Sequence, residues 1–364
     1  MLNRPTPAFS VQRRADPTSD ADRAALLADP GFGKVFTDHM VTIRWSLDKG
    51  WHDAKVEPRA AISLDPAAAV LHYAQTIFEG MKAYRAPDGG AVLFRPEENA
   101  KRFNRSAQRM AMPELPESLF IEAIDRLVDI DRAWIPDGEG SLYLRPFMFA
   151  NETFLGVRPA HEYLFMVIAS SVGAYFKNKA PAVSVWVSQD YTRAAPGGTG
   201  AAKCGGNYAG SLIAQAEAYD HGCDQVVFLD AAERRWIEEL GGMNVFFVFE
   251  DGSMLTPPKG GTILEGITRE LVITLARERG LTVREEPYSI DQWRADAASG
   301  KLRETFACGT AAVLTPIGQV KSANGDFTIG NGGSGAQTES LRQALSDIQR
   351  GKAEDTHGWV HRID

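Results

Sequence analysis

Short stretches of the chain alternate between hydrophobic and polar residues. Residues 41–46 (VTIRWS) place apolar side chains at every second position, which predicts a strand with one buried face. Residues 48–50 (DKG) follow and predict a turn. Two longer runs, 141–149 and 163–172, also predict strands, and the second is apolar enough for a central strand.

Helical periodicity appears twice between residues 97 and 130. The second pattern starts behind Pro116, a residue favoured at helix starts. Its apolar side chains form one stripe: Phe120, Ala123, Ile124, Leu127 and Val128. We expect both segments to be cover helices, and together with the strands they predict an N-terminal α/β domain over residues 1–172.

The chain is long enough for two domains, because 364 residues exceed the usual size of one hydrophobic core. Residues 173–181 (GAYFKNKAP) combine Gly, Lys and Pro without apolar periodicity. This composition predicts an interdomain connection, which we place at 173–182. A C-terminal domain then covers 183–364.

The expected elements of the second domain mix without strict βαβ alternation, which favours an α+β fold. The turn dipeptide Asp251-Gly252 closes one strand, and Gly280 and Gly351 follow two of the helices. The expected strands are 182–188, 225–230 and 243–250, and the expected helices are roughly 208–221, 266–279 and 338–350.

Charge and composition exclude some classes of protein. The 39 basic and 47 acidic residues give a net charge of −8, which disfavours nucleic acid or an anionic membrane as the main partner. Residues 1–30 contain no continuous apolar core, so we expect neither a signal peptide nor a membrane anchor, and a cytoplasmic location. The three cysteines form no CxxC pair, so neither a disulfide framework nor a metal site is expected.

The most unusual segment is GGTGAAKCGGNY (197–208), in which five glycines surround Lys203. An ordinary surface turn is the simplest interpretation. A Walker A loop is excluded because Ala202 precedes the lysine and Cys204 follows it. A dinucleotide fingerprint from Gly198 also fails, since Lys203 occupies the third glycine position.

A true GxGxxG match lies at Gly330, Gly332 and Gly335, between the short strand-like DFTI and the last expected helix. The chain ends soon after that helix, which leaves no second strand for a βαβ unit. We therefore interpret this match as a plain loop.

A lysine among glycines can approach a flat cofactor closely, because glycine has no side chain to interfere. Pyridoxal phosphate needs such a lysine, an acidic partner for its ring nitrogen and an anion site for its phosphate. Glu239 lies in the apolar segment IEELGGMNVFF, and residues 263–270 (ILEGITRE) form a Gly-containing turn that runs into a helix able to bind phosphate. An exposed lysine and an ordinary helix start are the competing interpretations.

Several long segments in the same order resemble the branched-chain aminotransferases, which are fold-type IV pyridoxal-phosphate enzymes. Only the first thirty or so residues stand outside the resemblance, which implies a two-domain α+β fold. The segments are FGKVFTDHM (32–40), FEGMKAYR (78–85), LFRPEENAKRFNRSAQRM (93–110), SLYLRPFMFANETFLGV (141–157), AKCGGNY (202–208), EELGGMN (238–244), LEGITRE (264–270) and CGTAAVLTPI (308–317).

This resemblance implies pyridoxal 5′-phosphate as cofactor, with Lys203 as the Schiff-base lysine that also carries the proton between substrate and cofactor. Glu239 corresponds to the partner of the pyridine nitrogen and Tyr208 to the phenol that bonds the ring oxygen. The implied phosphate ligands are Arg102, the amides of Ile267 and Thr268, and Thr310.

The same resemblance implies one pocket for two kinds of substrate, namely leucine, isoleucine or valine and then glutamate or 2-oxoglutarate. Backbone amides of Thr310 and Ala311, in a turn that Gly309 makes possible, would hold the substrate carboxylate. The side-chain pocket would comprise Phe32, Tyr73, Phe78, Tyr143 and Arg145, of which the aromatic residues would otherwise be assigned to the core.

Leu155 and Val157 resemble residues that reach the neighbouring subunit's pocket, which implies a homodimer. The chain departs from some relatives at Ala312 and Thr315, where those carry a CxxC pair, so redox control by thiols is not expected. Gly242 replaces a common Thr. The alternatives are a D-amino-acid aminotransferase or aminodeoxychorismate lyase of the same fold, or a non-catalytic homologue.

Overall fold

The computed structural model describes residues 6–173 and 182–363. The chain divides into two compact units. Unit 1 comprises Met1–Lys177, Ala202–Gly205 and Ile348–Asp364, and unit 2 comprises Asn178–Ala201 and Gly206–Asp347. The predicted connection at 173–182 falls largely outside the described residues. The units also differ from two consecutive stretches of chain, because the Lys203 segment and the C-terminal segment both belong to unit 1.

Unit 1 is built on a sheet that has ten strands in its described part, in the order β1-β4-β3-β9-β8-β6-β7-β19, with β2 beside β9 and β5 beside β8. Within this part only β1 and β4 pair in parallel, so the predicted α/β character is wrong for this unit, which is α+β. The strands are β1 (Ser10–Val11), β2 (Val35–Phe36), β3 (His39–Ser46), β4 (Gly50–Pro58), β5 (Thr76–Phe78), β6 (Met81–Arg85), β7 (Ala91–Phe94), β8 (Ser141–Ala150), β9 (Glu162–Val172) and β19 (Val360–Ile363).

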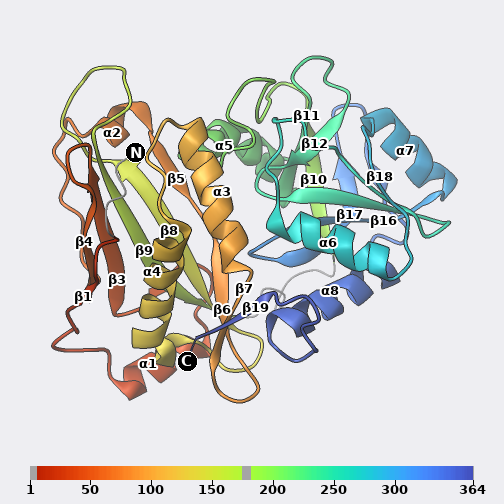
Figure 1. Ribbon diagram of the computed structural model, residues 1–364. Helices are drawn as coiled ribbons and strands as arrows, with labels where there is room; N and C mark the ends of the chain where they lie inside the picture. Colours follow the sequence, from red (N-terminus) through yellow and green to blue (C-terminus); the bar gives the residue numbers. More distant parts are fainter. Residues whose placement is uncertain (1–5, 174–181, 364) are drawn as a thin grey trace. The chain divides into compact units, whose positions relative to one another are not determined.

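The predicted strands and turn of this half are confirmed. Residues 41–46 lie in β3, and the run 163–172 lies in β9, which is central between β3 and β8. Gly50 adopts a φ of 70° in the turn between β3 and β4, a conformation that glycine allows without strain. The C-terminal β19 returns to pair with β7, as the dark-blue arrow beside the orange strand in Figure 1 shows.

The predicted cover helices α3 (Pro96–Arg109) and α4 (Glu117–Ile130) lie side by side across one face of this sheet (Figure 1). The apolar stripe of α4 is fully buried there, and Phe120 and Phe165 both pack around Phe103 with ring centroids 5.5 Å from it. Unit 1 also contains α1 (Asp20–Ala28), α2 (Ala69–Tyr73) and the 3₁₀ helix η1 (Arg132–Trp134).

The alternation of side chains along β8 shows which residues lie on the opposite face of this sheet. Leu142 and Leu144 are completely buried in the core below α3 and α4. Because successive side chains of a strand point to opposite faces, Tyr143 and Arg145 lie on the other face. Lys82 pairs with Tyr143 across β6 and β8 and shares that face.

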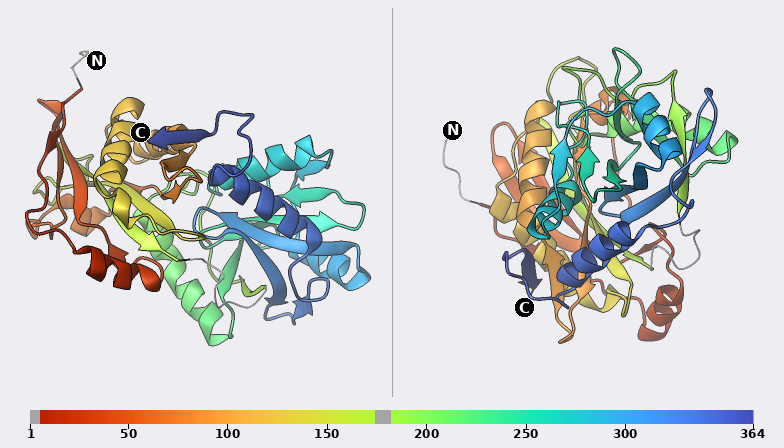
Figure 2. Two further views of the ribbon diagram at one scale, coloured as in Figure 1. Left: turned by 90° about the horizontal axis from the view of Figure 1, so that it is seen from below. Right: turned by 90° about the vertical axis from the view of Figure 1, so that its right-hand side faces the viewer.

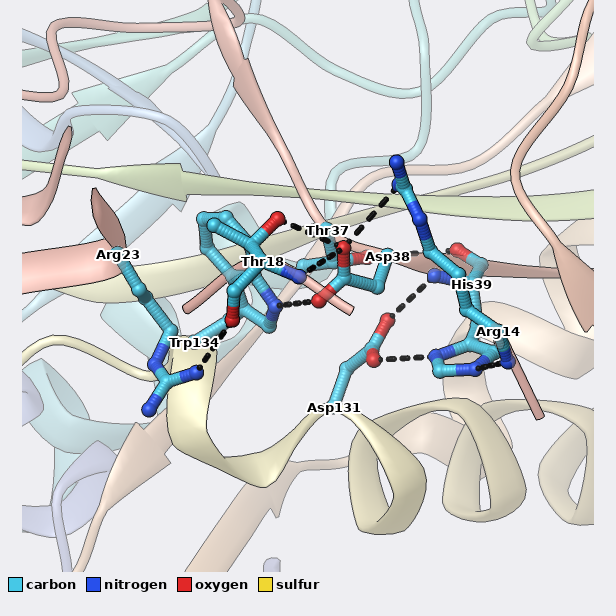
Figure 3. A network of polar contacts seen from close by, with 8 residues as sticks. All are labelled: Arg14, Thr18, Arg23, Thr37, Asp38, His39, Asp131 and Trp134. Carbon is cyan, nitrogen blue, oxygen red and sulfur yellow. Dashed lines mark hydrogen bonds and ion pairs between the residues drawn. The ribbon is translucent and has the colours of Figure 1, made fainter. Parts of the chain in front are cut away.

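Residues 6–30 are more ordered than their polar sequence indicates. Ser19 caps α1 by accepting a hydrogen bond from the backbone of Asp22. Figure 3 shows Asp38 accepting hydrogen bonds from Thr18, whose hydroxyl lies at 2.8 Å, from Arg14 at 3.2 Å and from the Trp134 ring at 3.1 Å. These contacts attach the N-terminal segment to the start of β3.

His39 is the second centre of this network (Figure 3). The backbone amide of Arg14 donates to His39 Nε2 at 3.0 Å, and His39 Nδ1 lies 2.7 Å from Asp131. Since Nε2 accepts a hydrogen bond, Nδ1 carries the proton that is donated to the carboxylate. His39 and Asp131 are both buried.

Unit 2 contains a mixed sheet whose described part has nine strands, in the order β12-β11-β10-β17-β16-β13-β14-β15 with β18 beside β17. β10 pairs in parallel with both β11 and β17. The predicted strands 182–188, 225–230 and 243–250 correspond to β10, β11 and β13. The bounds are β10 (Val183–Ser188), β11 (Gln225–Leu229), β12 (Ile237–Leu240), β13 (Asn244–Phe249), β14 (Met254–Thr256), β15 (Val283–Glu285), β16 (Leu302–Gly309), β17 (Val313–Lys321) and β18 (Phe327–Thr328).

Helices cover both faces of the sheet of unit 2. Ala214 and Ala218 of α5 (Gly205–Asp220) pack with Trp186, whereas Val185 and Val187 share the opposite core with Trp293 of α7 (Ile290–Ser299). The predicted helices 266–279 and 338–350 are α6 (Ile267–Glu278) and α8 (Ala336–Gln349). Figure 2 shows α8 in blue from two further directions.

The GxGxxG match of unit 2 forms a loop between β18 and α8, as predicted. The expectation that no strand follows the last helix is wrong, because β19 comes after α8. This strand pairs with β7 and therefore does not complete a βαβ unit with β18. The carboxylate of Glu304 accepts the backbone amides of Gln337 and Thr338 at 2.9 and 2.8 Å. A Cβ atom on Gly335 would overlap this same carboxylate. A protein carboxylate therefore already fills the anion position at the start of α8.

In the stretches 6–173 and 182–363, no helix is both long and apolar enough to cross a membrane.

Candidate functional site

The lysine segment is attached to unit 1 by its backbone. The amide of Lys203 donates to Ser106 Oγ of α3 at 2.9 Å, and the carbonyl of Lys203 accepts from the amide of Phe78 at 3.0 Å. Cys204 forms an isolated bridge with Ile77 of β5. These contacts fix the backbone on both sides of the lysine, while the glycines before it, such as Gly197 and Gly198, lie in an exposed turn.

The amine of Lys203 points at the ring of Phe78, with Nζ 4.8 Å from the ring centroid. The guanidinium carbon of Arg145 lies at the same distance, 4.8 Å, from this centroid. Arg145 also donates to the phenolic oxygen of Tyr143 at 3.1 Å, and Tyr143 makes an edge contact with Phe32. Four residues expected to line a substrate pocket therefore form one chain of contacts within unit 1 that reaches the lysine amine through Phe78.

Arg145 lacks a carboxylate partner among the described residues, and its buried Nε atom has no hydrogen-bond partner there. The guanidinium is partly buried, and its loss of hydration is unfavourable unless an anion binds it. The geometry therefore fits a site for a carboxylate near the Phe78 ring.

Gly80 makes room for the Tyr143 phenol. A Cβ atom at position 80 would overlap the phenolic oxygen. The glycine of the FEGMKAYR segment is thus required by the close approach of Tyr143, and it sets the position of one wall of the site.

Arg102 is buried on α3 and forms a two-pronged ion pair with Glu79. Its Nε and Nη2 atoms donate to the two carboxylate oxygens at 2.7 and 2.8 Å. Burial would raise the pKa of the Glu79 carboxyl, but the charge of Arg102, with further help from Lys203, outweighs burial and lowers this pKa. Glu79 therefore stays ionised beside Arg102.

Three other residues expected to bind substrate, Tyr73, Leu155 and Val157, are exposed on unit 1. The hydroxyl of Tyr73 donates to the carbonyl of Leu155 at 2.6 Å. The side chains of Leu155 and Val157 are 66% and 90% exposed in the single chain. Apolar side chains this exposed are available for contact outside the chain.

In unit 2, Glu239 is buried and fully engaged by protein groups. Its carboxylate lies 2.8 Å from Arg193 Nη1 and accepts from Asn244 at 3.1 Å and from the amide of Leu264 at 2.8 Å. Arg193 therefore already compensates the charge of this buried carboxylate within unit 2.

Asn244 also packs against the segment that leads into α6. Its side chain donates to the carbonyl of Leu264 at 3.0 Å, and a Cβ atom on Gly266 would overlap its Oδ1. Gly266 is the N-cap residue of α6, and Ile267 and Thr268 form the first turn. The amides of this turn belong to the helix N-terminus, which is suited to a phosphate.

Thr310 and Ala311 occupy the turn between β16 and β17. The residue with positive φ beside this turn is Val313, at 60°, the first residue of β17, whereas Gly309 is the last residue of β16 and does not have a positive φ. The expected role of Gly309 in bending the turn is therefore wrong. A Cβ atom there would lie 3.1 Å from Met243 Cγ, so this glycine serves close packing.

Tyr208 lies near the start of α5. A Cβ atom on Gly242 would stand 3.8 Å from its ring, an ordinary van der Waals distance. Gly242 therefore leaves open space beside Tyr208 within unit 2.

Glu79 and Arg193, which bind Arg102 and Glu239, are not among the residues predicted from the sequence. A usable signal existed for Glu79, because Arg102 falls in the buried stripe of α3 with Asn99 and Ser106, and a buried arginine needs a carboxylate. No comparable pattern marks Arg193, which lies in the irregular segment before the glycine-rich stretch.

Residues 76–320 match the family model of class IV aminotransferases, described as Amino-transferase class IV. The chain belongs to the class IV aminotransferase family. Enzymes of this class use pyridoxal 5′-phosphate. The fold-type IV architecture and the class of enzyme expected from the sequence are thereby confirmed.

The most similar relatives carry names for one particular activity. A Streptomyces coelicolor protein named "Probable branched-chain-amino-acid aminotransferase" is 57% identical over 98% of this chain and 99% of its own length. The branched-chain-amino-acid aminotransferase of Mycobacterium tuberculosis is 54% identical, with 98% of each chain covered. This resemblance extends to the N-terminal residues that the sequence argument had left outside it.

Solved structures agree in fold. The branched-chain amino acid aminotransferase of Escherichia coli has a TM-score of 0.71 and 32% identity, covering 83% of this chain and 94% of that one. The branched-chain amino acid aminotransferase of Thermobaculum terrenum, in its holo-form with pyridoxal phosphate, has a TM-score of 0.72 and 26% identity, covering 88% and 98%.

Proposed function

We propose that this protein is a branched-chain amino-acid aminotransferase. It would transfer the amino group of L-leucine, L-isoleucine or L-valine reversibly to 2-oxoglutarate, giving the branched-chain 2-oxo acid and L-glutamate. The observation that carries the proposal is the single ring of Phe78, which contacts both the amine of Lys203 and the guanidinium of Arg145. An amine, an apolar wall and an anion-binding group are what the two kinds of substrate require.

The residues of each unit fit pyridoxal phosphate, which acts when bound as the electron sink for the substrate's Cα–H bond. Lys203 would hold the cofactor and move the proton between the substrate Cα and the cofactor C4′. Glu239, which is paired with Arg193, would keep the ring nitrogen protonated. Tyr208 would donate to the ring oxygen.

Phosphate recognition would come from a cation and from backbone amides. Arg102 offers a guanidinium fixed by Glu79. Ile267 and Thr268 offer amides at the start of α6, and Thr310 offers a hydroxyl. These donor types suit a dianion.

One wall of the pocket would recognise both kinds of substrate, because it combines apolar rings with polar groups that can bind an anion. Phe32 and Phe78 would contact the branched aliphatic side chain, while Arg145 and the phenol of Tyr143 would bind the distal carboxylate of glutamate. The amides of Thr310 and Ala311 would bind the carboxylate on Cα. Tyr73 would line the exposed side of the pocket, where its hydroxyl donates to the carbonyl of Leu155.

The exposure of Leu155 and Val157 supports a homodimer in which these residues reach the partner's pocket. A cytoplasmic location fits the substrates of amino-acid metabolism.

The test is a transamination assay with the full chain and pyridoxal phosphate. Each branched-chain L-amino acid is paired with 2-oxoglutarate, and D-leucine is the control. We expect glutamate and the matching 2-oxo acid from the L-substrates only. Preference for D-leucine would indicate a D-amino-acid aminotransferase, and bound cofactor without transfer would indicate a non-catalytic homologue.

A further inference from the structure

Glu79 joins the strand that contacts the lysine segment to the helix that carries Arg102. Its neighbour Phe78 donates to the carbonyl of Lys203, and its own amide donates to the carbonyl of Pro146 at 2.7 Å. Its side chain is completely buried. Backbone hydrogen bonds of Phe78 and Glu79 therefore fix the position from which the carboxylate extends.

The carboxylate of Glu79 is saturated with donors. Besides the two bonds from Arg102, it accepts from Asn99 Nδ2 at 2.7 Å and from the amide of Gly80 at 3.3 Å. Asn99 and Arg102 lie three residues apart on α3 and so share one side of that helix. Both carboxylate oxygens of Glu79 thus accept hydrogen bonds from side chains of α3, which fixes the carboxylate relative to this helix.

Stability alone gives little reason for such a pair. Removing two charges from water is costly, and a buried ion pair often stabilises a protein no better than apolar residues of the same size. A two-pronged ion pair can, however, fix the plane of a guanidinium, because its two parallel hydrogen bonds prevent the group from rotating. Glu79 occupies the Nε–Nη2 edge, so the Nη1 group of Arg102 is directed away from Glu79.

We propose that Glu79 is a positioning residue that orients Arg102 toward the phosphate of the cofactor. The inference rests on the proposed function, in which Arg102 is a phosphate ligand. Glu79 touches neither substrate nor cofactor in this account. It acts by presetting the guanidinium, so that binding the phosphate does not have to order a flexible side chain.

The test compares two cofactor forms that differ only in phosphate. The purified full chain is freed of cofactor and titrated with pyridoxal phosphate and with pyridoxal, and the ratio of the two dissociation constants measures phosphate preference. Glu79→Gln has only one acceptor oxygen, so it can accept only one of the two bonds from Arg102, and it loses the charge. We expect the preference for the phosphorylated form to fall about tenfold, the effect of one charge-assisted hydrogen bond.

A matched control is Asp131→Asn, which weakens another buried pair in unit 1, that with His39. It should lower the melting temperature and leave the phosphate preference unchanged. If Glu79→Gln also only lowers the melting temperature, with an unchanged or increased phosphate preference, Glu79 is a structural ion-pair partner and the inference is overturned.

Arg102→Met separates this inference from the function on which it rests. If Arg102→Met retains the phosphate preference, the phosphate role of Arg102 fails. If Arg102→Met loses it and Glu79→Gln does not, only the positioning role fails. Should Glu79→Gln not fold, Asn99→Ala removes one bond to the same carboxylate, and a smaller fall in the same ratio is expected. No fall in Asn99→Ala would then contradict the proposal.

Discussion

Arg145 donates a hydrogen bond of 3.1 Å to the phenolic oxygen of Tyr143. A phenol cannot neutralise a guanidinium, so this pair leaves the charge of Arg145 uncompensated within the described residues. The two side chains come from the same strand and face, at alternate positions of β8. We propose that they form a preset binding site for a carboxylate.

Arg145→Met should therefore act on one half of the reaction. We expect kcat/KM for glutamate and 2-oxoglutarate to fall roughly ten- to a hundredfold, because a charge-assisted bond is lost. The half-reaction with leucine should remain nearly intact. Single-turnover kinetics on each half-reaction measure this, and equal losses with leucine and glutamate would refute the recognition role.

Glu239→Gln should lower kcat more than cofactor affinity. The amide keeps the shape of the side chain but loses the charge that would hold the ring nitrogen protonated, and that charge matters most in the transition state. Arg193 would then lack its anionic partner at 2.8 Å, so a lower melting temperature is expected as well. An unchanged kcat with weakened cofactor binding would assign Glu239 a purely structural role.

Gly80→Ala should displace Tyr143, because the added methyl group would overlap the phenol. We expect a raised KM for both amino-acid classes and a lower melting temperature. Gly210→Ala on α5 is the matched control, since its added Cβ meets nothing within 4 Å. It should stabilise the protein by about 0.5–1 kcal/mol, the gain of Ala over Gly in a helix. Normal kinetics in Gly80→Ala would show that Tyr143 does not set the pocket.

Strand and helix prediction succeeded where one face of an element is buried. The alternation over residues 41–46 and the stripe of α4 both report burial directly, and both elements form as expected. The mostly antiparallel pairing in unit 1 was not predictable, because the sheet joins β7 to β19, which lies at the other end of the chain. Local periodicity contains no information on such pairings.

In the candidate site, too, local sequence pattern predicts some features, whereas other contacts depend on how distant segments fold together. Alternation in β8 is enough to place Tyr143 and Arg145 on one face. The contact of Arg193 with Glu239 depends on the path of an irregular segment, and the contact of Glu79 with Arg102 depends on the packing of α3 against β5. Neither follows from spacing, although a buried arginine in the stripe of α3 indicates that some carboxylate must be near.

The Asp38 network should make stability depend on acidic pH. Burial raises the pKa of the Asp38 carboxyl, but hydrogen bonds from Thr18 and Trp134 and the charge of Arg14 outweigh burial, so this pKa lies below its ordinary value. The carboxylate therefore contributes stability above its unfolded pKa of about 3.9, and the contribution is lost as pH falls toward the folded pKa. Melting temperatures of wild type and Asp38→Asn should differ clearly at pH 7 and converge below pH about 4. A difference that persists at low pH would contradict this account.

The identity of the cofactor-binding lysine is the central claim, and it can be read directly. The holo-protein is reduced with borohydride to trap the cofactor on its lysine, digested and analysed by mass spectrometry. Lys82 is the informative competitor, because burial, assisted by the charge of Arg350, lowers its pKa to about 8, so more of its amine is in the neutral, reactive form near pH 7. We predict the phosphopyridoxyl mass on the peptide containing Lys203 and its absence in Lys203→Ala. Label on Lys82 with Lys203 unmodified would contradict the account.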